Sequence, residues 1–239
     1  MSSYSFRLNW RVTAFACVCL PVFVYLGFWQ LDREEEKRGL LAQLALRAEQ
    51  PGVPLSMLAI EDDLNGWPVI LDGRFDEEVI LLLDNRVLDG KVGFEAHQLF
   101  HDESGTKVLV NRGFVQMGRT RADKLDIPSV SFQRTLLKGT VYKPSEQSYV
   151  LTNEEASFAG FPAIVQQINI VQFGKAMGYS VYPYTVRLEQ DQAGALPRYW
   201  PSSVMQPEQH MGYAVQWFAM AIAVFIAWLF FSVRRKEEL

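Results

Sequence analysis

The stretch that decides the architecture is HMGYAVQWFAMAIAVFIAWLFFSV, residues 210–233, which is followed directly by the basic residues RRK at 234–236. An uncharged apolar run of about 20 residues is long enough to cross a bilayer as a helix. Basic residues directly after such a run mark the side that stays in the cytoplasm. The pattern therefore predicts a C-terminal membrane span whose end is cytoplasmic. It places His210 at the opposite, outer mouth of that helix.

A second uncharged run occupies residues 12–31, VTAFACVCLPVFVYLGFWQL, between Trp10 and Asp32. Signal peptides have a shorter apolar core and a small-residue cleavage site, and this run has neither. We therefore expect an uncleaved membrane anchor, kinked at Pro21, with Trp10 and Trp29 as interfacial anchors.

The two spans together predict the topology. With the C-terminus inside and two crossings, the N-terminus is also inside and the middle of the chain is outside. The predicted division is a cytoplasmic tail at 1–11, a first span at 12–31, an extracytoplasmic domain at 32–209, a second span at 210–233 and a cytoplasmic tail at 234–239.

The middle of the chain predicts a short helical extension and then a sheet. A stripe of leucine and alanine continues to residue 49, where Pro51-Gly52 is expected to end the helix. Asn169 and Gly178 are expected to cap a helix at 169–177. Alternating apolar and polar residues or short apolar runs predict strands at 69–75, 79–83, 92–99, 107–115, 134–142 and 180–189. Turns are expected between them, among others at Asp84-Asn85 and Asp89-Gly90. The predicted fold is a membrane protein in which two transmembrane helices flank a β-rich α+β domain, a small barrel or a curved antiparallel meander.

Composition and motifs exclude several classes of protein. The net charge of −4 does not suit a nucleic-acid-binding protein. The two cysteines, Cys17 and Cys19, lie in the first apolar run, so the middle domain has no thiolate metal site. No Gly-x-Ser-x-Gly elbow, phosphate-binding glycine loop or His-Glu-x-x-His motif occurs, and we expect no enzymatic activity. His97 and His101 are four residues apart, at and just beyond the end of a predicted strand. In an extended chain they would be about 13 Å apart, so we do not expect them to bind a metal together.

His210 is the strongest candidate for a ligand. On a helix, Tyr213 and Trp217 follow it on the same face, together with two alanines. An imidazole beside flat aromatic rings could accept a planar macrocycle, and neutral imidazole is a standard axial ligand of haem. Two other interpretations stay open: interfacial anchoring by these side chains, and copper binding by His210 with Met205 or Met211.

Three segments in order resemble one family, the SURF1 (Surfeit locus 1) proteins. The first is LGFWQL-x-R-x-x-x-K at residues 26–37, where the first span ends. The second is KVGF at 91–94 followed by VLVNRGFV at 108–115, and the third is H-x-x-YA-x-x-WF at 210–218. Phe28 and Phe114 depart mildly from the family pattern. Residues 122–194 match it only loosely, so nothing specific is carried over there.

The resemblance implies a role in the assembly of cytochrome c oxidase. Members of the family are associated with building the haem a centre of oxidase subunit I, and bacterial members with haem a binding through a histidine at the position of His210. By this resemblance haem a is the expected cofactor and His210 the expected axial ligand of its iron. From the helix spacing, the face of Tyr213 and Trp217 is expected to shape the pocket, with the first helix as its other wall. Subunit I, haem A synthase and the lipid bilayer are the expected partners, and a bacterial inner membrane with a periplasmic domain is the expected location. Motif residues with a structural or docking role are Gly27, Trp29, Gln30, Arg33, Asn111, Arg112 and Gly113.

Two rival functions remain open at this point. One is a scaffold that stabilises an oxidase assembly intermediate without touching haem. The other is periplasmic copper handling by Met205, His210 and Met211. A membrane-anchored hydrolase is the least favoured, because the sequence contains no recognisable pairing of a nucleophile with a base.

Overall fold

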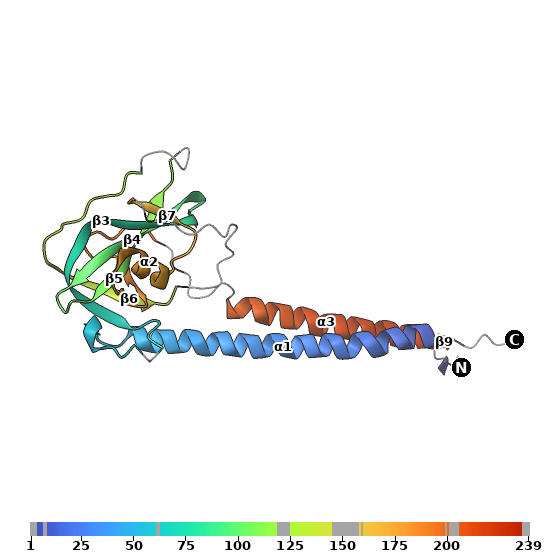
Figure 1. The fold of residues 1–239 in the computed structure, drawn as a ribbon. Coiled ribbons are helices and arrows are strands. Elements are labelled where there is room, and N and C mark those ends of the chain that lie inside the picture. The colour runs from blue at the N-terminus through green and yellow to red at the C-terminus, as the bar shows by residue number, and fades with distance from the viewer. Residues whose placement is uncertain are drawn as a thin grey trace. The chain divides into compact units, whose positions relative to one another are not determined.

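The computed structural model describes residues 4–6, 9–60, 63–118, 125–144, 158, 160–198, 200 and 206–235 (Figure 1). The chain divides into two compact units. The helical unit contains residues 1–43 and 201–239, and the barrel unit contains residues 44–200.

Two long helices form the helical unit. Helix α1 covers Trp10–Ala48 and runs through Pro21 without a break, and helix α3 covers Pro207–Ser232. They lie side by side in Figure 1, and both are long and apolar enough to cross a membrane. Most of their large apolar side chains are exposed, as Phe15 and Phe230 illustrate. Such a surface suits lipid better than water.

The ends of the two helices are joined by a feature that the sequence did not predict. Strand β1, Tyr4–Phe6, pairs antiparallel with strand β9, Val233–Arg235. Because this pairing holds the start of α1 beside the end of α3, both termini lie at the same end of the helix pair.

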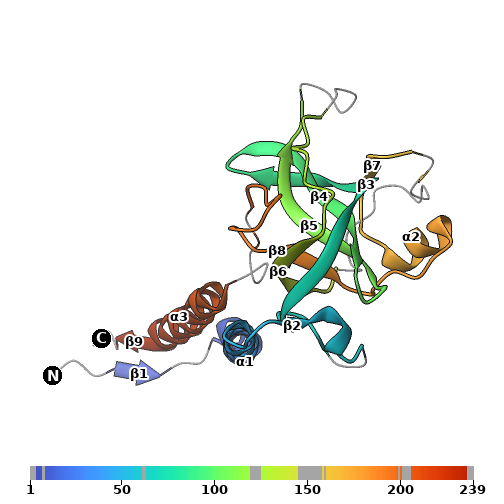
Figure 2. The ribbon, with the colours of Figure 1, turned by 90° about the vertical axis from the view of Figure 1, so that its left-hand side faces the viewer.

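A closed sheet forms the barrel unit. Its strand order is β2-β3-β4-β5-β8-β6, and β6 also pairs with β3, so that the five strands from β3 to β6 form a closed path and β2 lies outside it (Figure 2). Strand β7 pairs with β3 outside this path. The strands are β2 Val53–Pro54, β3 Pro68–Leu88, β4 Lys91–Asp102, β5 Lys107–Gln116, β6 Thr135–Tyr142, β7 Ala163–Val165 and β8 Thr185–Leu188, with a short 3-10 helix η1 at Leu55–Met57.

Strand β3 is a single strand where the sequence predicted two. Its pairing with β4 shifts register between Phe75 and Ile80, and again between Leu83 and Arg86. The predicted turn at Asp84-Asn85 is therefore wrong, because these residues form a bulge inside β3. The chain turns at Asp89-Gly90, where both φ angles are positive, +50° and +75°, as a two-residue hairpin requires.

The order of the strands also differs from the predicted meander. Strand β8 lies between β5 and β6, parallel to β5 and antiparallel to β6. It is also shorter than predicted, because residues 180–184 are not in a strand. Strand β7 was not predicted at all. Such long-range pairings leave little local signal in a sequence.

The two faces of the sheet have separate cores. All five strands of the closed path contribute to the first core, which is enclosed by the barrel and contains Val108, Val110 and Leu137. The intervening Leu109 points the other way, into a second core with Phe173 of α2. Helix α2, Ile170–Met177, begins as predicted, with the Asn169 side chain accepting a hydrogen bond from the Gln172 amide at 2.9 Å, and the αL residue Gly178 ends it. The structure confirms the fold class: two apolar terminal helices flank a β-rich domain with a closing sheet.

A pair of adjacent leucines in β6 tests this arrangement. Leu137 is fully buried in the barrel core, whereas its neighbour Leu136 is 61% exposed. We expect Leu137→Ala to cost about 2–5 kcal/mol of the free energy of unfolding, because it leaves a cavity. Leu136→Ala should cost less than about 0.5 kcal/mol. Thermal unfolding of both variants, followed by circular dichroism in detergent, measures the difference, and equal losses would contradict the enclosed barrel.

Candidate functional site

One hydrogen bond links the candidate ligand to the first helix. The Nδ1 atom of His210 in α3 lies 2.8 Å from Oε1 of Gln30 in α1. The His210 residue is only 8% exposed and Gln30 is half-buried, so the hydrogen bond is largely shielded from solvent. The predicted wall of the site, the first helix, is therefore in direct contact with the imidazole.

This contact assigns the protonation of the ring. An amide oxygen only accepts hydrogen bonds, so Nδ1 of His210 carries the proton and donates it to Gln30. In a neutral imidazole the other nitrogen, Nε2, then keeps its lone pair. Histidine ligands of metals are commonly oriented in this way, by a hydrogen bond from the nitrogen that does not bind the metal. The sequence named Gln30 as a motif residue, but it gave no sign that Gln30 and His210 would meet.

Gly27 allows the two helices to approach closely next to this pair. A Cβ atom at Gly27 would lie 2.6 Å from the Phe218 ring, closer than carbon atoms can pack. The Phe218 ring also meets Phe28 edge to face, with the ring centroids 5.3 Å apart. The structural role predicted for Gly27 thus has a concrete cause, since Phe218 fills the space that a side chain would need.

The two aromatic residues predicted to shape a pocket lie in different surroundings. Trp217 faces α1 and packs on Phe23, with the ring centroids 5.6 Å apart. Tyr213 is 46% exposed, on the outside of the helix pair. The structure therefore brings Trp217 but not Tyr213 to the packed face of His210. An offset of three residues on this helix is enough to rotate Tyr213 out of the interface.

Trp29 and Arg33 lie on the outer surface of α1. The Arg33 guanidinium carbon is 5.7 Å from the centroid of the Trp29 ring, and Arg33 pairs with Glu36 at 2.6 Å. Both motif residues are partly exposed, so they are available to lipid headgroups or to a partner rather than to the helix interface.

Arg112 of the barrel unit is a buried structural cation. It is 1% exposed and donates to the carbonyl oxygens of Gly194 at 2.9 Å and Pro128 at 2.6 Å, and to Oε1 of Gln98 at 2.8 Å. Burial lowers the pKa of Arg112 to about 10. These three acceptors are uncharged, and two of them belong to loops, so Arg112 fastens those loops to the barrel.

The neighbours of Arg112 complete this structural motif. The Asn111 side chain accepts a hydrogen bond from the Gly113 amide at 3.0 Å and donates one to Glu95 at 2.9 Å. Gly113 has a φ of +125°, and a Cβ there would lie 2.6 Å from the carbonyl oxygen of Leu196. Only glycine fits this position without strain.

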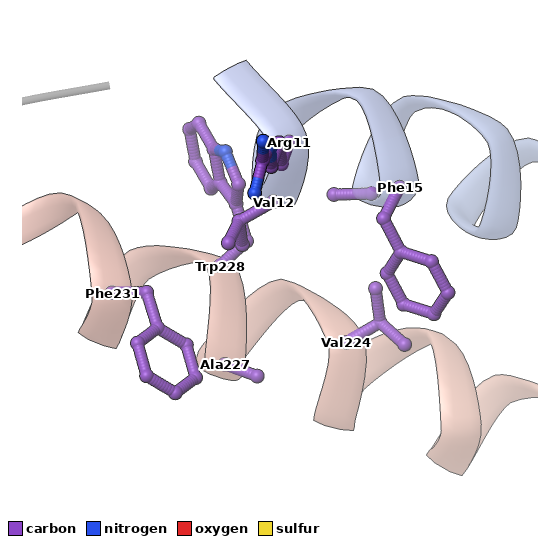
Figure 3. Close-up of a pocket in the computed structure, with 8 residues that line it drawn as sticks. Arg11, Val12, Phe15, Val224, Ala227, Trp228 and Phe231 are labelled. Atoms are coloured by element: carbon purple, nitrogen blue, oxygen red, sulfur yellow. The ribbon is translucent and has the colours of Figure 1, made fainter. Parts of the chain in front are cut away.

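One hollow among the described residues of the helical unit lies away from His210. It has a volume of about 340 Å³ and is lined by both helices near Arg11 and Trp228 (Figure 3). The Trp228 indole also donates to the Thr13 hydroxyl at 3.1 Å, close to the chain ends. His210 and Gln30 are at the other end of the helix pair, so the hollow does not serve the predicted ligand.

The other candidate metal ligands are scattered. Met205 lies outside the described residues, and Met211 is 40% exposed. His101 pairs with Asp76 at 2.8 Å, whereas His97 is buried 3.8 Å from Glu95. No group of three or more histidine, cysteine or acidic residues that could hold a metal occurs in the part of the chain that the structure describes.

Comparison with known proteins gives a consistent result. An uncharacterized SURF1-like protein of Mycobacterium bovis is 27% identical over 237 residues, covering 95% of this chain and 84% of that protein. A SURF1-like protein of Rickettsia felis is 22% identical over 222 residues, covering 90% of this chain and 93% of that protein. Surfeit locus protein 1 of Gallus gallus is 24% identical over 225 residues, covering 85% of this chain and 69% of that protein.

The sequence profile of the SURF1 family matches residues 17–222. This range contains the barrel unit, the Gly27–Phe218 contact and the pairing of Gln30 with His210. Since the match covers most of the chain, from within the first apolar helix to within the second, the protein belongs to the SURF1 family.

Proposed function

We propose that this protein is a non-enzymatic assembly factor for cytochrome c oxidase, which carries haem a as its cargo at the outer face of a bacterial inner membrane. In this proposal His210 binds the iron, and the cargo passes to oxidase subunit I. Membership of the SURF1 family supports the role in assembly, and the oriented imidazole supports the role in binding.

The observation that carries the proposal is the hydrogen bond between Gln30 and His210. It holds the ring in the tautomer whose Nε2 can bind a metal, at the polar end of α3. A hydrogen bond of this kind inside a membrane is worth about 1 kcal/mol, which is enough to fix the orientation of a ring.

The chemistry of the ligand fits a haem, while the space around it points to temporary binding. Phe218 fills the gap above Gly27, and His210 is enclosed. A macrocycle at Nε2 therefore needs neighbouring side chains to move. If these side chains pack together again once the haem has left, release of the haem is favoured, and an assembly factor must release its cargo.

The proposed topology has both termini in the cytoplasm and the barrel unit in the periplasm. The pairing of β1 with β9 puts both chain ends on one side of the helix pair, and the basic residues after α3 favour the cytoplasm for that side. His210 is then at the periplasmic end, where haem A synthase and subunit I are the proposed partners.

A comparison of variants at the two ends of the helix pair tests haem binding. We expect His210→Ala to abolish the haem absorption band of protein purified from cells that make haem A, because the ligand is lost. Gln30→Leu should weaken haem binding by about 10–100-fold, since it removes the group that orients the imidazole. The control is Thr13→Val, which removes a hydrogen bond between the same helices far from His210 and should leave the spectrum unchanged. An unchanged spectrum in His210→Ala would remove His210 from this role.

The tight packing of Phe218 on Gly27 also supports a second candidate, a scaffold that stabilises an oxidase intermediate without haem. The two candidate functions predict different results when variants are expressed in a strain that lacks the chromosomal gene for this protein. If the protein carries haem, His210→Ala should abolish oxidase activity while normal amounts of the variant remain in the membrane. If it is a scaffold, His210→Ala should support full oxidase activity, whereas Gly27→Leu, which forces Phe218 and the helices apart, should not. Spectroscopic measurement of oxidase in the membranes, with immunoblots for the variant, separates these outcomes.

A further inference from the structure

A cluster of polar side chains covers part of the outer face of the barrel, and none of its residues belongs to the proposed haem site. Glu95 and His97 lie on the same face of β4, His97 is opposite Asn111 of β5, and Asn111 is opposite Arg187 of β8. This face continues from the second core, because Leu99 and Leu109 lie one step further along the same strands. Arg86 of β3 completes the cluster on the other side of Glu95.

Several buried nitrogen atoms in this cluster have no hydrogen-bond partner within the described part of the chain. They are Nε of Arg86, both ring nitrogens of His97, Nε of Arg187 and Nε1 of Trp200. Each buried group left without a partner costs about 1–3 kcal/mol. One ring nitrogen of a neutral histidine is an acceptor, so the cluster holds four such donors, on Arg86, His97, Arg187 and Trp200. A group of donors in one place that no described residue satisfies indicates a site for an additional acceptor.

The carboxylate inside the cluster does not fill this need. Glu95 accepts from Asn111 at 2.9 Å, but its oxygens are 3.8 Å from Nε2 of His97 and 3.9 Å from Nε of Arg86. These last two distances are too long for hydrogen bonds. Burial of the Glu95 carboxyl raises its pKa, but the contact with His97, the positive charge of Arg86 and the hydrogen bond from Asn111 lower it by more, to about 2.

The charges of the cluster do not balance. Among the described residues of the cluster, Arg86 and Arg187 are cationic and Glu95 is the single anion. Burial lowers the pKa of His97, so that its ring is neutral near pH 7. Burial also lowers the pKa of Arg187, and the charge of Arg86 lowers it further, although Tyr142 and Glu95 raise it. One surplus positive charge remains, which a monoanion would neutralise.

Aromatic rings define how an anion can approach Arg187. The guanidinium carbon lies 3.4 Å from the centroid of the Tyr142 ring and 5.0 Å from that of Trp200. Rings occupy the face of a guanidinium, so its N–H groups stay available at its edge. A carboxylate is planar and accepts two parallel hydrogen bonds from that edge. The same rings give apolar surface for the remainder of the ligand.

The cluster is open to solvent on one side. The side chain of Arg86 is 39% exposed and that of Glu95 is 18% exposed, whereas His97 beside them is 3% exposed. We propose that this outer face of the barrel binds a monocarboxylate with an apolar body, held edge-on by Arg187 and Arg86 above the buried His97.

Calorimetry with a matched pair of probes tests the site. We expect benzoate to bind saturably to the full-length protein in detergent at pH 7, with benzamide and inorganic phosphate binding more weakly by about tenfold. Benzamide has the same shape without the charge. Phosphate is charged but has no apolar body to pack on the aromatic rings. Heats of dilution into empty micelles are subtracted.

Variants locate the binding. Arg187→Gln should weaken benzoate binding by about tenfold, since it removes a charged hydrogen-bond donor. Arg86→Gln gives a second measurement at a more exposed position, in case Arg187→Gln fails to fold by circular dichroism. The control is Arg134→Gln, which removes a cation that is paired with Asp72 elsewhere on the barrel. It should bind benzoate like the unaltered protein.

Three results would overturn the proposal. The first is the absence of saturable benzoate binding, which would mean that water satisfies the buried donors. The second is equal affinity for benzoate and benzamide, or tighter binding of phosphate. The third is unchanged benzoate affinity in folded Arg187→Gln or Arg86→Gln.

Discussion

The helical unit depends on a polar contact between its two helices, the part-buried hydrogen bond between Gln30 and His210. Neither side chain gains from being enclosed alone, because a buried polar group without a partner is costly. Together they fix which faces of the two helices meet. The Gly27–Phe218 contact then lets the helices pack closely beside that pair. Orientation of the imidazole, packing of the helices and availability of Nε2 thus follow from one interaction.

The barrel unit depends instead on residues that fasten its loops to the closing sheet. The buried Arg112 side chain donates hydrogen bonds to two loop carbonyl oxygens. The backbone of Gly113 lies so close to the carbonyl of Leu196 that a Cβ atom would not fit. The Asn111 side chain bonds to the backbone two residues later. The motif Asn111-Arg112-Gly113 is therefore a structural device, and its residues are unavailable to a haem or to a partner.

The outer face of the same strands has an opposite character. The three side-chain nitrogens of Arg112 each have an acceptor, whereas Nε of Arg187 and the His97 ring have no partner among the described residues. Complete satisfaction is typical of a residue that stabilises the fold. Unsatisfied buried donors beside aromatic rings and a surplus positive charge are typical of a surface that binds. The two arginines of the barrel therefore have different roles: Arg112 stabilises the fold, whereas Arg187 belongs to the candidate ligand site.

Local sequence determined a large part of this protein. Uncharged runs of sufficient length define the two apolar helices, Asp89-Gly90 defines a hairpin, and Asn169 with Gly178 defines both ends of α2. It also identified His210 and Gly27 as special positions. Tertiary structure alone decided that Gln30 meets His210, that Tyr213 points outward, that β3 continues through Asn85, and that β8 enters between β5 and β6. The physical reason is that capping, turn geometry and hydrophobic runs act over a few residues. Pairing across 180 positions is set by which surfaces bury each other.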